Sequence, residues 1–280
     1  MQDELAFAYL LRCRNGSLYA GWTDDLAARL HAHKSGAGAR YTRGFGAAGL
    51  AWAQLLPGKS EAMRREAALK KLPKAQKEAL AAAWQADMRP RLALATPADA
   101  ADILDVYGWY VRNSTATFAC RPPALGAYQA FMAATARACP FLVARGGQGQ
   151  LLGFAYAHPW HEREAFHWDV ETTIYCSPAA CGTGTAGPLY TALLALLRAQ
   201  GYWNAYALIA DPNPASEAFH ARFGFVCEGR SPRTGYKLGR WVGLSTWALP
   251  LKKGRTAPGP VLPPLAGEAA ACILQAAQGG

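Results

Sequence analysis

A lapse in hydrophobic periodicity at residues 85–91, "QADMRPR", divides this chain into two parts. Before the lapse, short apolar runs alternate with amphipathic segments, and after it a new apolar run, "RLALA", starts a second series. Domain boundaries fall in polar segments of this kind, which few contacts cross. With 280 residues, the chain is long enough to bury two hydrophobic cores. We therefore expect an α+β protein with domains at residues 1–85 and 90–250.

The first part opens with two apolar runs, residues 7–11 and 17–22, joined by "RCRNG". The Asn15-Gly16 step between them is a strong hairpin signal, because both residues tolerate the positive φ of a tight turn. The first part is therefore predicted to be a small α/β module that starts with a hairpin. Its further helices and strands are expected at residues 24–36, 50–56, 60–72 and 74–84.

The second part alternates longer strands and helices, as expected for a mixed, mostly antiparallel sheet flanked by helices. Strands are expected at residues 91–95, 141–145, 151–158, 166–177, 203–210, 225–229 and 243–250. Helices are expected at residues 97–109, 124–138, 188–200 and 214–222, with a glycine-rich loop at 182–187. Because residues 251–267 are rich in Pro and Gly, we expect residues 251–280 to form a disordered tail, with at most a stray helical turn at "AAACILQAAQ".

Charge and cysteine content restrict the class of protein. The formal net charge is +10, which favours polyanionic or phosphate-bearing partners, and residues 26–44 contain basic side chains but no carboxylate. Seven cysteines without a CxxC pair argue against a disulfide framework and a zinc site. No run reaches the roughly eighteen apolar residues of a membrane span. We expect a soluble cytoplasmic protein without a membrane partner.

Residues 6–80 carry an ordered set of tyrosines, basic residues and one glutamate. "FAYLL" and "LYAG" stand where the GIY-YIG endonuclease family has its two name-giving segments, and "RREAALKKL" stands where it has a metal-binding glutamate. The whole segment resembles this family, especially its small single-domain bacterial members. The positions that match the family's catalytic and metal-binding residues are Tyr9, Tyr19, Arg29, His33 and Glu66.

This resemblance implies a phosphodiesterase site. Glu66 would hold a Mg²⁺ ion that keeps most of its waters, and Tyr9 or His33 would serve as the base, with assistance from Tyr19. Arg29 would stabilise the charge of the transition state. The basic helix and the "GARYTRG" loop at residues 38–44, both within the basic stretch 26–44, would then contact DNA phosphates.

The second part carries an ordered series of segments across residues 90–250 that includes "NSTATF", "VETTIYCSPAACGTGTAGPLY", "DPNPASEAFHARFGF" and "GYKLGRW". These segments resemble the GNAT superfamily of N-acetyltransferases, and within it the phosphinothricin/methionine-sulfone group. A glycine loop between a strand and a helix can cradle the pyrophosphate of acetyl-CoA. The residues that the resemblance assigns to acetyl-CoA are Cys181, Gly182, Thr183, Gly184, Thr185, Ala186, Gly187, Asn213 and Ser216.

The same resemblance implies the catalytic and acceptor residues. Glu171 matches the family's acidic residue, which removes a proton from the amine, and burial on its strand would raise its pKa. His220 matches a histidine that acts as a second proton relay or contacts the substrate, and packing alone is its alternative role. A small amino acid with an anionic or strongly polar side chain is the expected acceptor. Its expected contacts are Thr117, Phe118, Arg163, Lys237 and Arg240.

The sequence therefore predicts an acetyl-CoA-dependent N-acetyltransferase fused to a GIY-YIG nuclease-like module. The alternative is a metal-dependent DNA endonuclease whose GNAT half only binds acyl-CoA or regulates. A third possibility is an N-terminal module that binds nucleic acid without cutting it. Relatives of the acetyltransferase half suggest a homodimer.

Overall fold

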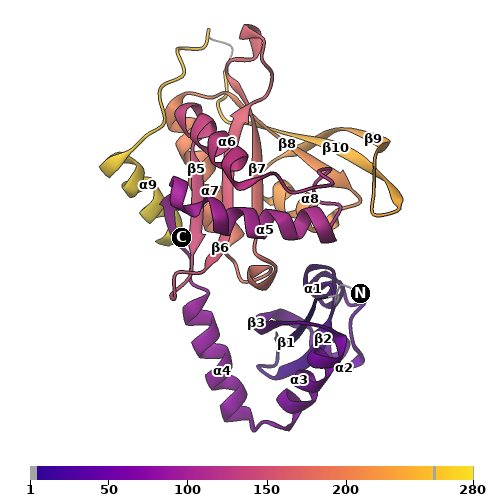
Figure 1. The fold of residues 1–280 in the computed structure, drawn as a ribbon. Helices are drawn as coiled ribbons and strands as arrows, with labels where there is room; N and C mark the ends of the chain where they lie inside the picture. The colour runs from indigo at the N-terminus through magenta and orange to yellow at the C-terminus, as the bar shows by residue number, and fades with distance from the viewer. Residues whose placement is uncertain (1–4, 255–256, 280) are drawn as a thin grey trace. The chain divides into compact units, whose positions relative to one another are not determined.

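The computed structural model describes residues 5–254 and 257–279, and its elements are arranged in two compact units (Figure 1). The first unit comprises Met1–Pro90 together with the short segments Arg145–Leu152 and Cys176–Thr185. The second comprises Arg91–Ala144, Gly153–Tyr175 and Ala186–Gly280. Each unit is described separately below.

The first unit is built on a three-stranded antiparallel sheet in the order β2-β1-β3. The strands are β1 (Ala6–Cys13), β2 (Leu18–Thr23) and β3 (Ala47–Leu56). The helices are α1 (Leu26–Lys34), α2 (Arg40–Phe45), α3 (Lys59–Lys71) and α4 (Lys74–Asp87). Because β1 is the central strand, its side chains are buried on both faces, and Phe7, Tyr9 and Leu10 are at most 1% exposed.

The predicted hairpin between β1 and β2 is confirmed. Gly16 has a φ of +78°, and its N–H donates to the carbonyl of Cys13 over 2.9 Å. The Asn15 side chain accepts from the N–H of Ser17, which satisfies the turn. A bidentate pair between Arg12 and Glu78, at 2.7 and 2.6 Å, ties α4 to β1.

The second unit is built on a seven-stranded mixed sheet in the order β4-β5-β6-β7-β8-β10-β9. Its strands are β4 (Arg91–Leu94), β5 (Phe141–Arg145), β6 (Leu151–Pro159), β7 (Asp169–Cys176), β8 (Asn204–Asp211), β9 (Val226–Lys237) and β10 (Arg240–Pro250). Its α-helices are α5 (Ala100–Asn113), α6 (Leu125–Ala138), α7 (Ala186–Gln200), α8 (Pro214–Arg222) and α9 (Gly267–Gly279), and its 3₁₀ turns are η1 (Pro97–Asp99) and η2 (Glu164–Phe166). A third 3₁₀ turn, η3 (Pro178–Ala180), lies in the Cys176–Thr185 segment of the first unit. Helices flank the sheet, as the sequence predicted (Figure 1).

The two central strands β7 and β8 run parallel, and their described pairing ends at Glu171 opposite Tyr206. Both strands continue beyond this point, to Cys176 and Asp211. The Thr172 hydroxyl donates to the carbonyl of Tyr206 over 2.9 Å, so a side chain takes the place of a ladder bond. On its other side, β8 pairs with β10, which pairs with β9, both antiparallel.

Two expectations for loops and tails need correction. Residues 40–45, expected as a loop, form α2, which places Thr42 in the interior. The expected disorder of residues 251–280 is wrong for residues 267–279, which form α9, and residues 255–256 and 280 lie outside the described residues. The spacing of Ala270, Leu274 and Ala277 gives α9 a buried face, which packs against α7 and β4.

Side-chain hydrogen bonds also connect the C-terminal segment to the second unit. The Gln278 side chain accepts from the N–H of Leu92 at the edge strand β4, over 3.1 Å. The Gln200 side chain at the end of α7 donates to the carbonyl of Leu262 over 3.0 Å, and the backbone carbonyl of Gln200 accepts from the N–H of Leu262 over 2.7 Å. Among the described helices, none is both long and apolar enough to cross a membrane.

Replacing Leu274 by Ala tests whether α9 stabilises the second unit. Leu274 is 7% exposed, and removing most of a buried leucine side chain costs about 2 kcal/mol or more of unfolding free energy. We expect a lower melting temperature and denaturant midpoint for Leu274→Ala in the full chain. Gln275→Ala, on the exposed face of α9, is the control. Equal stability of the two variants would mean that α9 does not dock in solution.

Candidate functional sites

A buried cluster of hydrogen-bonded side chains lies beside the sheet of the first unit. The Tyr9 hydroxyl on β1 is 2.8 Å from Nε2 of His33 on α1, and the Arg29 Nε–H donates to the same hydroxyl over 3.3 Å. Nδ1 of His33 is 2.6 Å from the hydroxyl oxygen of Thr42. Tyr9, His33 and Thr42 are at most 1% exposed. Three of the predicted catalytic residues therefore meet in one network.

The partners in this network fix the direction of each hydrogen bond. The Thr42 hydroxyl donates its single hydrogen to the carbonyl of Ala39, so it can only accept from His33. Nδ1 of His33 therefore carries a hydrogen, and Nε2 of the neutral ring accepts the hydrogen of the Tyr9 hydroxyl. Arg29 donates to the oxygen of that hydroxyl. The phenol is thus held between a base and a cation.

Burial and charge keep this network neutral apart from Arg29. Desolvation, followed by the nearby charge of Arg29, lowers the pKa of His33 to about 4. Desolvation also raises the pKa of Tyr9, although its hydrogen bond with Arg29 opposes the shift. The negative charge of Glu66 adds a smaller upward contribution to the pKa of Tyr9. Near neutral pH, the resting site therefore holds a protonated phenol and an unprotonated imidazole.

Two glycines make room for these rings. A Cβ on Gly21 of β2 would lie 2.5 Å from the hydroxyl oxygen of Tyr9, and a Cβ on Gly38 would overlap the ring of His33. Real side chains do not approach so closely, so both positions require the absence of a Cβ.

Tyr19 and Glu66 lie at the border of this cluster. The Tyr19 ring is 6.4 Å from the ring of Tyr9 and 5.6 Å from that of His33, measured between centroids. The Glu66 side chain on α3 is 15% exposed, and its Oε1 is 2.5 Å from Nζ of Lys70 one turn later. In the described part of the chain, no group of three or more His, Cys, Asp or Glu side chains forms a metal-binding cluster.

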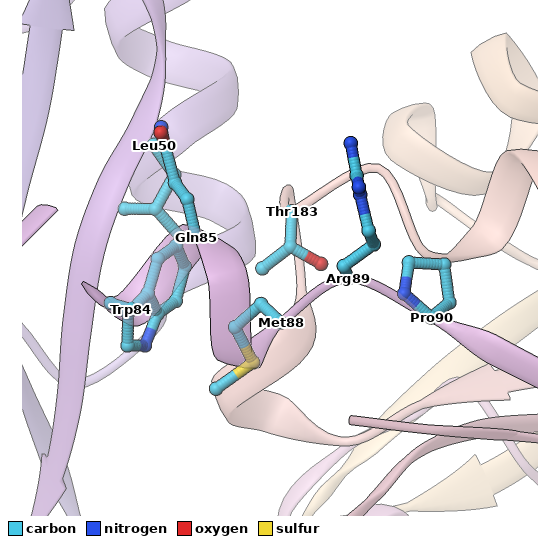
Figure 2. Close-up of a pocket in the computed structure, with 7 residues that line it drawn as sticks. All are labelled: Leu50, Trp84, Gln85, Met88, Arg89, Pro90 and Thr183. Carbon is cyan, nitrogen blue, oxygen red and sulfur yellow. The ribbon is translucent and has the colours of Figure 1, made fainter. Parts of the chain in front are cut away.

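The first unit also contains a cavity of about 300 Å³, whose lining residues are shown in Figure 2. The residues that line it are Leu50, Trp84, Gln85, Met88, Arg89, Pro90 and Thr183. None of these is a predicted nuclease residue, and Thr183 is the one predicted acetyl-CoA residue among them. The cavity is therefore not the phosphodiesterase site that the sequence predicted.

In the second unit, Glu171 stands at the point where β7 and β8 separate. Its side chain is 21% exposed, and burial raises the pKa of its carboxyl group while the nearby His158 opposes that shift. Nε2 of His158 on β6 is 3.9 Å from Oε2 of Glu171. Burial raises the pKa values of Tyr156 and Tyr175, and the nearby negative charge of Glu171 adds a smaller upward contribution to each. The carboxylate thus lies in a largely aromatic setting.

The predicted glycine loop connects η3 to α7. Gly182 and Gly184 have φ values of +79° and +93°, which residues other than glycine rarely adopt. The Thr183 hydroxyl donates to the carbonyl of Ala180 over 2.8 Å and accepts from the Thr185 hydroxyl over 2.8 Å. The loop turns directly into α7, which begins at Ala186. Its remaining predicted members, Cys181 and Gly187, flank these residues.

At the end of β8, Asn213 caps α8 by accepting from the N–H of Ser216 over 3.2 Å. His220 follows one turn later, 4% exposed, with Nδ1 2.9 Å from the carbonyl of Ser216. Because a carbonyl only accepts, Nδ1 carries the hydrogen. The His220 ring lies 5.3 Å from the rings of Tyr190 and Phe225, and burial lowers its pKa. This setting favours the packing role for His220.

Two of the predicted acceptor residues, Lys237 and Phe118, connect the β9–β10 hairpin to α5 and to the segment that follows α5. Lys237 is 5% exposed, and its Nζ donates to the carbonyls of Thr117 and Tyr110 at 2.7 and 3.4 Å. The ring of Phe118 lies against the backbone of Gly235 and leaves no room for a Cβ there. Lys237 therefore supports the loop that carries Thr117 and Phe118.

The other predicted acceptor residues are nearer the surface. Thr117 is 3.2 Å from the hydroxyl of Tyr107, and Arg240 is 3.4 Å from the hydroxyl of Thr115. Arg163 is exposed on the segment between β6 and β7. Lys237, Arg240 and Arg163 therefore do not form one cationic pocket, because the Lys237 ammonium group donates to two backbone carbonyls.

Sequence reasoning missed Thr42, Gly38 and His158. Thr42 and Gly38 lie in the stretch expected to be a phosphate-binding loop, and the fold of α2 turns Thr42 toward His33. His158 lies near the end of β6, and the local sequence pattern there does not indicate a functional residue. Its significance comes only from the neighbouring strand that carries Glu171.

Two parts of the chain match different known protein families. Residues 92–244 match the acetyltransferase (GNAT) domain family, and residues 6–79 match the GIY-YIG catalytic domain family. A phosphinothricin N-acetyltransferase from Streptomyces viridochromogenes is 35% identical over 55% of this chain and 83% of that protein. An L-methionine sulfoximine/L-methionine sulfone acetyltransferase from Pseudomonas paraeruginosa is 38% identical over 58% of this chain and 94% of that protein.

A solved acetyltransferase structure is similar to this chain in fold. The phosphinothricin acetyltransferase from Sinorhizobium meliloti, crystallised with acetyl-CoA, is 32% identical and superposes with a TM-score of 0.59. The match covers 61% of this chain and 94% of that one.

The buried setting of His33 predicts its titration. Because its pKa of about 4 lies below the unfolded value of 6.5, protonation favours unfolding. We therefore expect the unfolding free energy of the first unit to be fully present above pH 6.5 and to fall as the pH drops toward 4. NMR of the ring nitrogens should show a hydrogen on Nδ1 and no protonation of His33 between pH 7 and 5. A titration midpoint above pH 6 would contradict the network described here.

Proposed function

Because the chain belongs to the acetyltransferase (GNAT) family and also carries a GIY-YIG domain, we propose that it transfers the acetyl group of acetyl-CoA to the α-amine of a small polar amino acid. The observation that carries this proposal is the half-buried Glu171 at the point where β7 and β8 separate. A separation of parallel strands leaves backbone groups free to bind a ligand beside a potential base. The named activities of the phosphinothricin and methionine sulfone relatives support this acceptor class.

The residues around the glycine loop fit acetyl-CoA. Gly182 and Gly184 hold the backbone at positive φ. A Cβ at Gly184 or Gly187 would meet nothing within 4 Å, so the space beside these two glycines is open, whereas Gly182 lies against the Leu30 side chain. The amide groups of these glycines and the N-terminus of α7 would bind the pyrophosphate. Cys181, Thr183, Thr185 and Ala186 complete the loop, and Asn213 and Ser216 at the start of α8 would border the pantetheine arm. Acetyl-CoA supplies the activated thioester.

Glu171 would prepare the acceptor. A primary α-amine is mostly protonated at neutral pH, so its proton must leave before the nitrogen can attack a carbonyl carbon. The burial that raises the pKa of Glu171 makes this carboxylate a stronger base than an exposed glutamate. An acceptor held between β7 and the Thr117–Phe118 segment would place its amine beside this carboxylate. Of the three predicted cationic contacts, Lys237 is occupied by backbone carbonyls, so Arg240 and Arg163 are the two that could bind the acceptor's carboxylate.

A second candidate function follows from the Tyr9 network in the first unit. A phenol that donates to His33 and accepts from Arg29 can lose its proton to the imidazole and then accept one from an attacking water. Glu66 can hold Mg²⁺, which commonly binds one or two carboxylates and keeps its waters, once Lys70 moves away. We therefore propose phosphodiester hydrolysis of DNA at this site, with Arg29 stabilising the transition state and Tyr19 beside it.

Replacing Glu171 by Gln tests the acetyltransferase base. We expect kcat/KM to fall about 10²- to 10³-fold at pH 7, since a positioned base contributes roughly this factor. The assay measures CoA-thiol release from acetyl-CoA with phosphinothricin, methionine sulfone and methionine sulfoximine as acceptors. Glu164→Gln, an exposed glutamate on the β6–β7 connection, is the matched control. If no acceptor supports release by the folded wild-type chain, the amino-acid acceptor class is wrong and the endonuclease alternative takes precedence.

Replacing Tyr9 by Phe tests the nuclease site. The variant keeps the ring but loses the hydroxyl that links His33 and Arg29, so we expect cleavage of a labelled DNA in Mg²⁺ to fall by about 10²-fold or more. Tyr41→Phe, which alters an exposed tyrosine, is the control. EDTA should abolish cleavage while leaving any electrostatic DNA binding intact. Binding without cleavage by the wild-type chain would favour the binding-only alternative.

A further inference from the structure

His158 and Glu171 face each other from the neighbouring strands β6 and β7. Nε2 of His158 lies 3.9 Å from Oε2 of Glu171, and the His158 side chain is 35% exposed against 21% for Glu171. The imidazole is therefore the more solvent-accessible member of the pair. Among the described contacts of Glu171, His158 is its one ion-pair partner.

The orientation of the imidazole is fixed by the backbone. Nδ1 of His158 is 3.1 Å from the carbonyl oxygen of Pro159, which can only accept, so Nδ1 carries a hydrogen. In the neutral ring, the lone pair is therefore on Nε2, the atom that faces Glu171. A histidine held in this way can take a proton from the carboxyl group without changing its tautomer.

The other groups around Glu171 do not offer a proton path in the neutral pH range. Tyr156 on β6 and Tyr175 on β7 both lie within electrostatic reach of Glu171, and burial raises the pKa of each phenol, for Tyr156 to about 12. Tyr206 is opposite Glu171 in the β7–β8 register, and burial raises its pKa too. Of the titratable groups that the described residues place beside this carboxyl group, His158 is the one imidazole, and its Nε2 faces Glu171.

We propose that His158 acts through Glu171 by accepting the proton that Glu171 has removed from the acceptor amine and releasing it to solvent. This inference rests on the proposed role of Glu171 as the base. In the first step, the amine nitrogen keeps its electron pair and its proton passes to Oε2 of Glu171. In the second step, the proton passes to Nε2 of His158, giving an imidazolium, which then loses it to water. Glu171 is again an anion, and no other reactant is needed.

The separation of 3.9 Å is about 1 Å longer than a hydrogen bond between these groups, and catalytic contacts of this kind commonly tighten when substrate binds. A half-buried carboxyl group that has taken a proton needs a partner of this kind, because burial stabilises its neutral form. His158 opposes that stabilisation and connects the carboxyl group to the surface. It is thus a positioning residue for the reaction rather than a contact of the substrate.

The test compares His158→Gln with His167→Gln, which changes an exposed histidine that contacts Trp168. For His158→Gln we expect kcat at pH 7 to fall roughly tenfold, less than the loss from removing the base itself. The acid limb of the kcat/KM profile should move to higher pH, because the charge that lowers the pKa of Glu171 is gone. The loss should shrink at high pH, where the amine arrives unprotonated. His167→Gln should match the wild type.

A second variant separates proton transfer from structure. In His158→Ala, added imidazole should restore the rate in proportion to its concentration, and the double variant Glu171→Gln/His158→Gln should be no slower than Glu171→Gln alone. An unchanged pH profile in His158→Gln, or an equal loss at every pH without imidazole rescue, would overturn the role of His158. Retention of full activity by Glu171→Gln would instead overturn the proposed base, on which this inference depends.

Discussion

The separation of β7 from β8 after Glu171 is the constraint on which the second unit depends. Parallel strands normally continue their ladder, and ending it leaves backbone groups that need other partners. Thr172 supplies one partner by donating to the carbonyl of Tyr206, and the Tyr190 hydroxyl in turn donates to Thr172 over 2.7 Å. This chain of bonds holds the strands at the branch point, so the carboxylate of Glu171 remains half-buried beside it.

The first unit reaches a reactive arrangement by a different physical route. Its key groups are fully buried, and each hydrogen bond has one possible direction because Thr42 has already donated its hydrogen to Ala39. The direction of the hydrogen bonds from Tyr9 to His33 is therefore determined by Thr42, which is not among the predicted catalytic residues. Gly21 and Gly38 have the same importance, because the rings approach the backbone too closely for any side chain.

Local signals in the sequence were sufficient for much of this fold. Asn15-Gly16 predicted the first hairpin, and the glycine loop before α7 was predicted by its place between an apolar strand and a helix. The sequence failed where tertiary contacts decide. For α9 only a stray helical turn was expected after the Pro-rich segment, and its three buried positions are explained only by its packing against α7. Similarly, Lys237 was interpreted as a substrate cation because its backbone partners, Tyr110 and Thr117, are more than a hundred residues away in sequence.

In the two proposed functions, both sites would remove a proton near neutral pH, with opposite electrostatics. At Tyr9, desolvation raises the pKa of the phenol, the hydrogen bond from Arg29 opposes that shift, and burial keeps the imidazole of His33 unprotonated near neutral pH. At Glu171, aromatic burial strengthens a carboxylate base, which then needs a route for the captured proton. A fully buried base suits a reaction in which the proton returns to the leaving group. A half-buried base next to an exposed histidine suits acetylation, in which a proton must leave for solvent in every turnover.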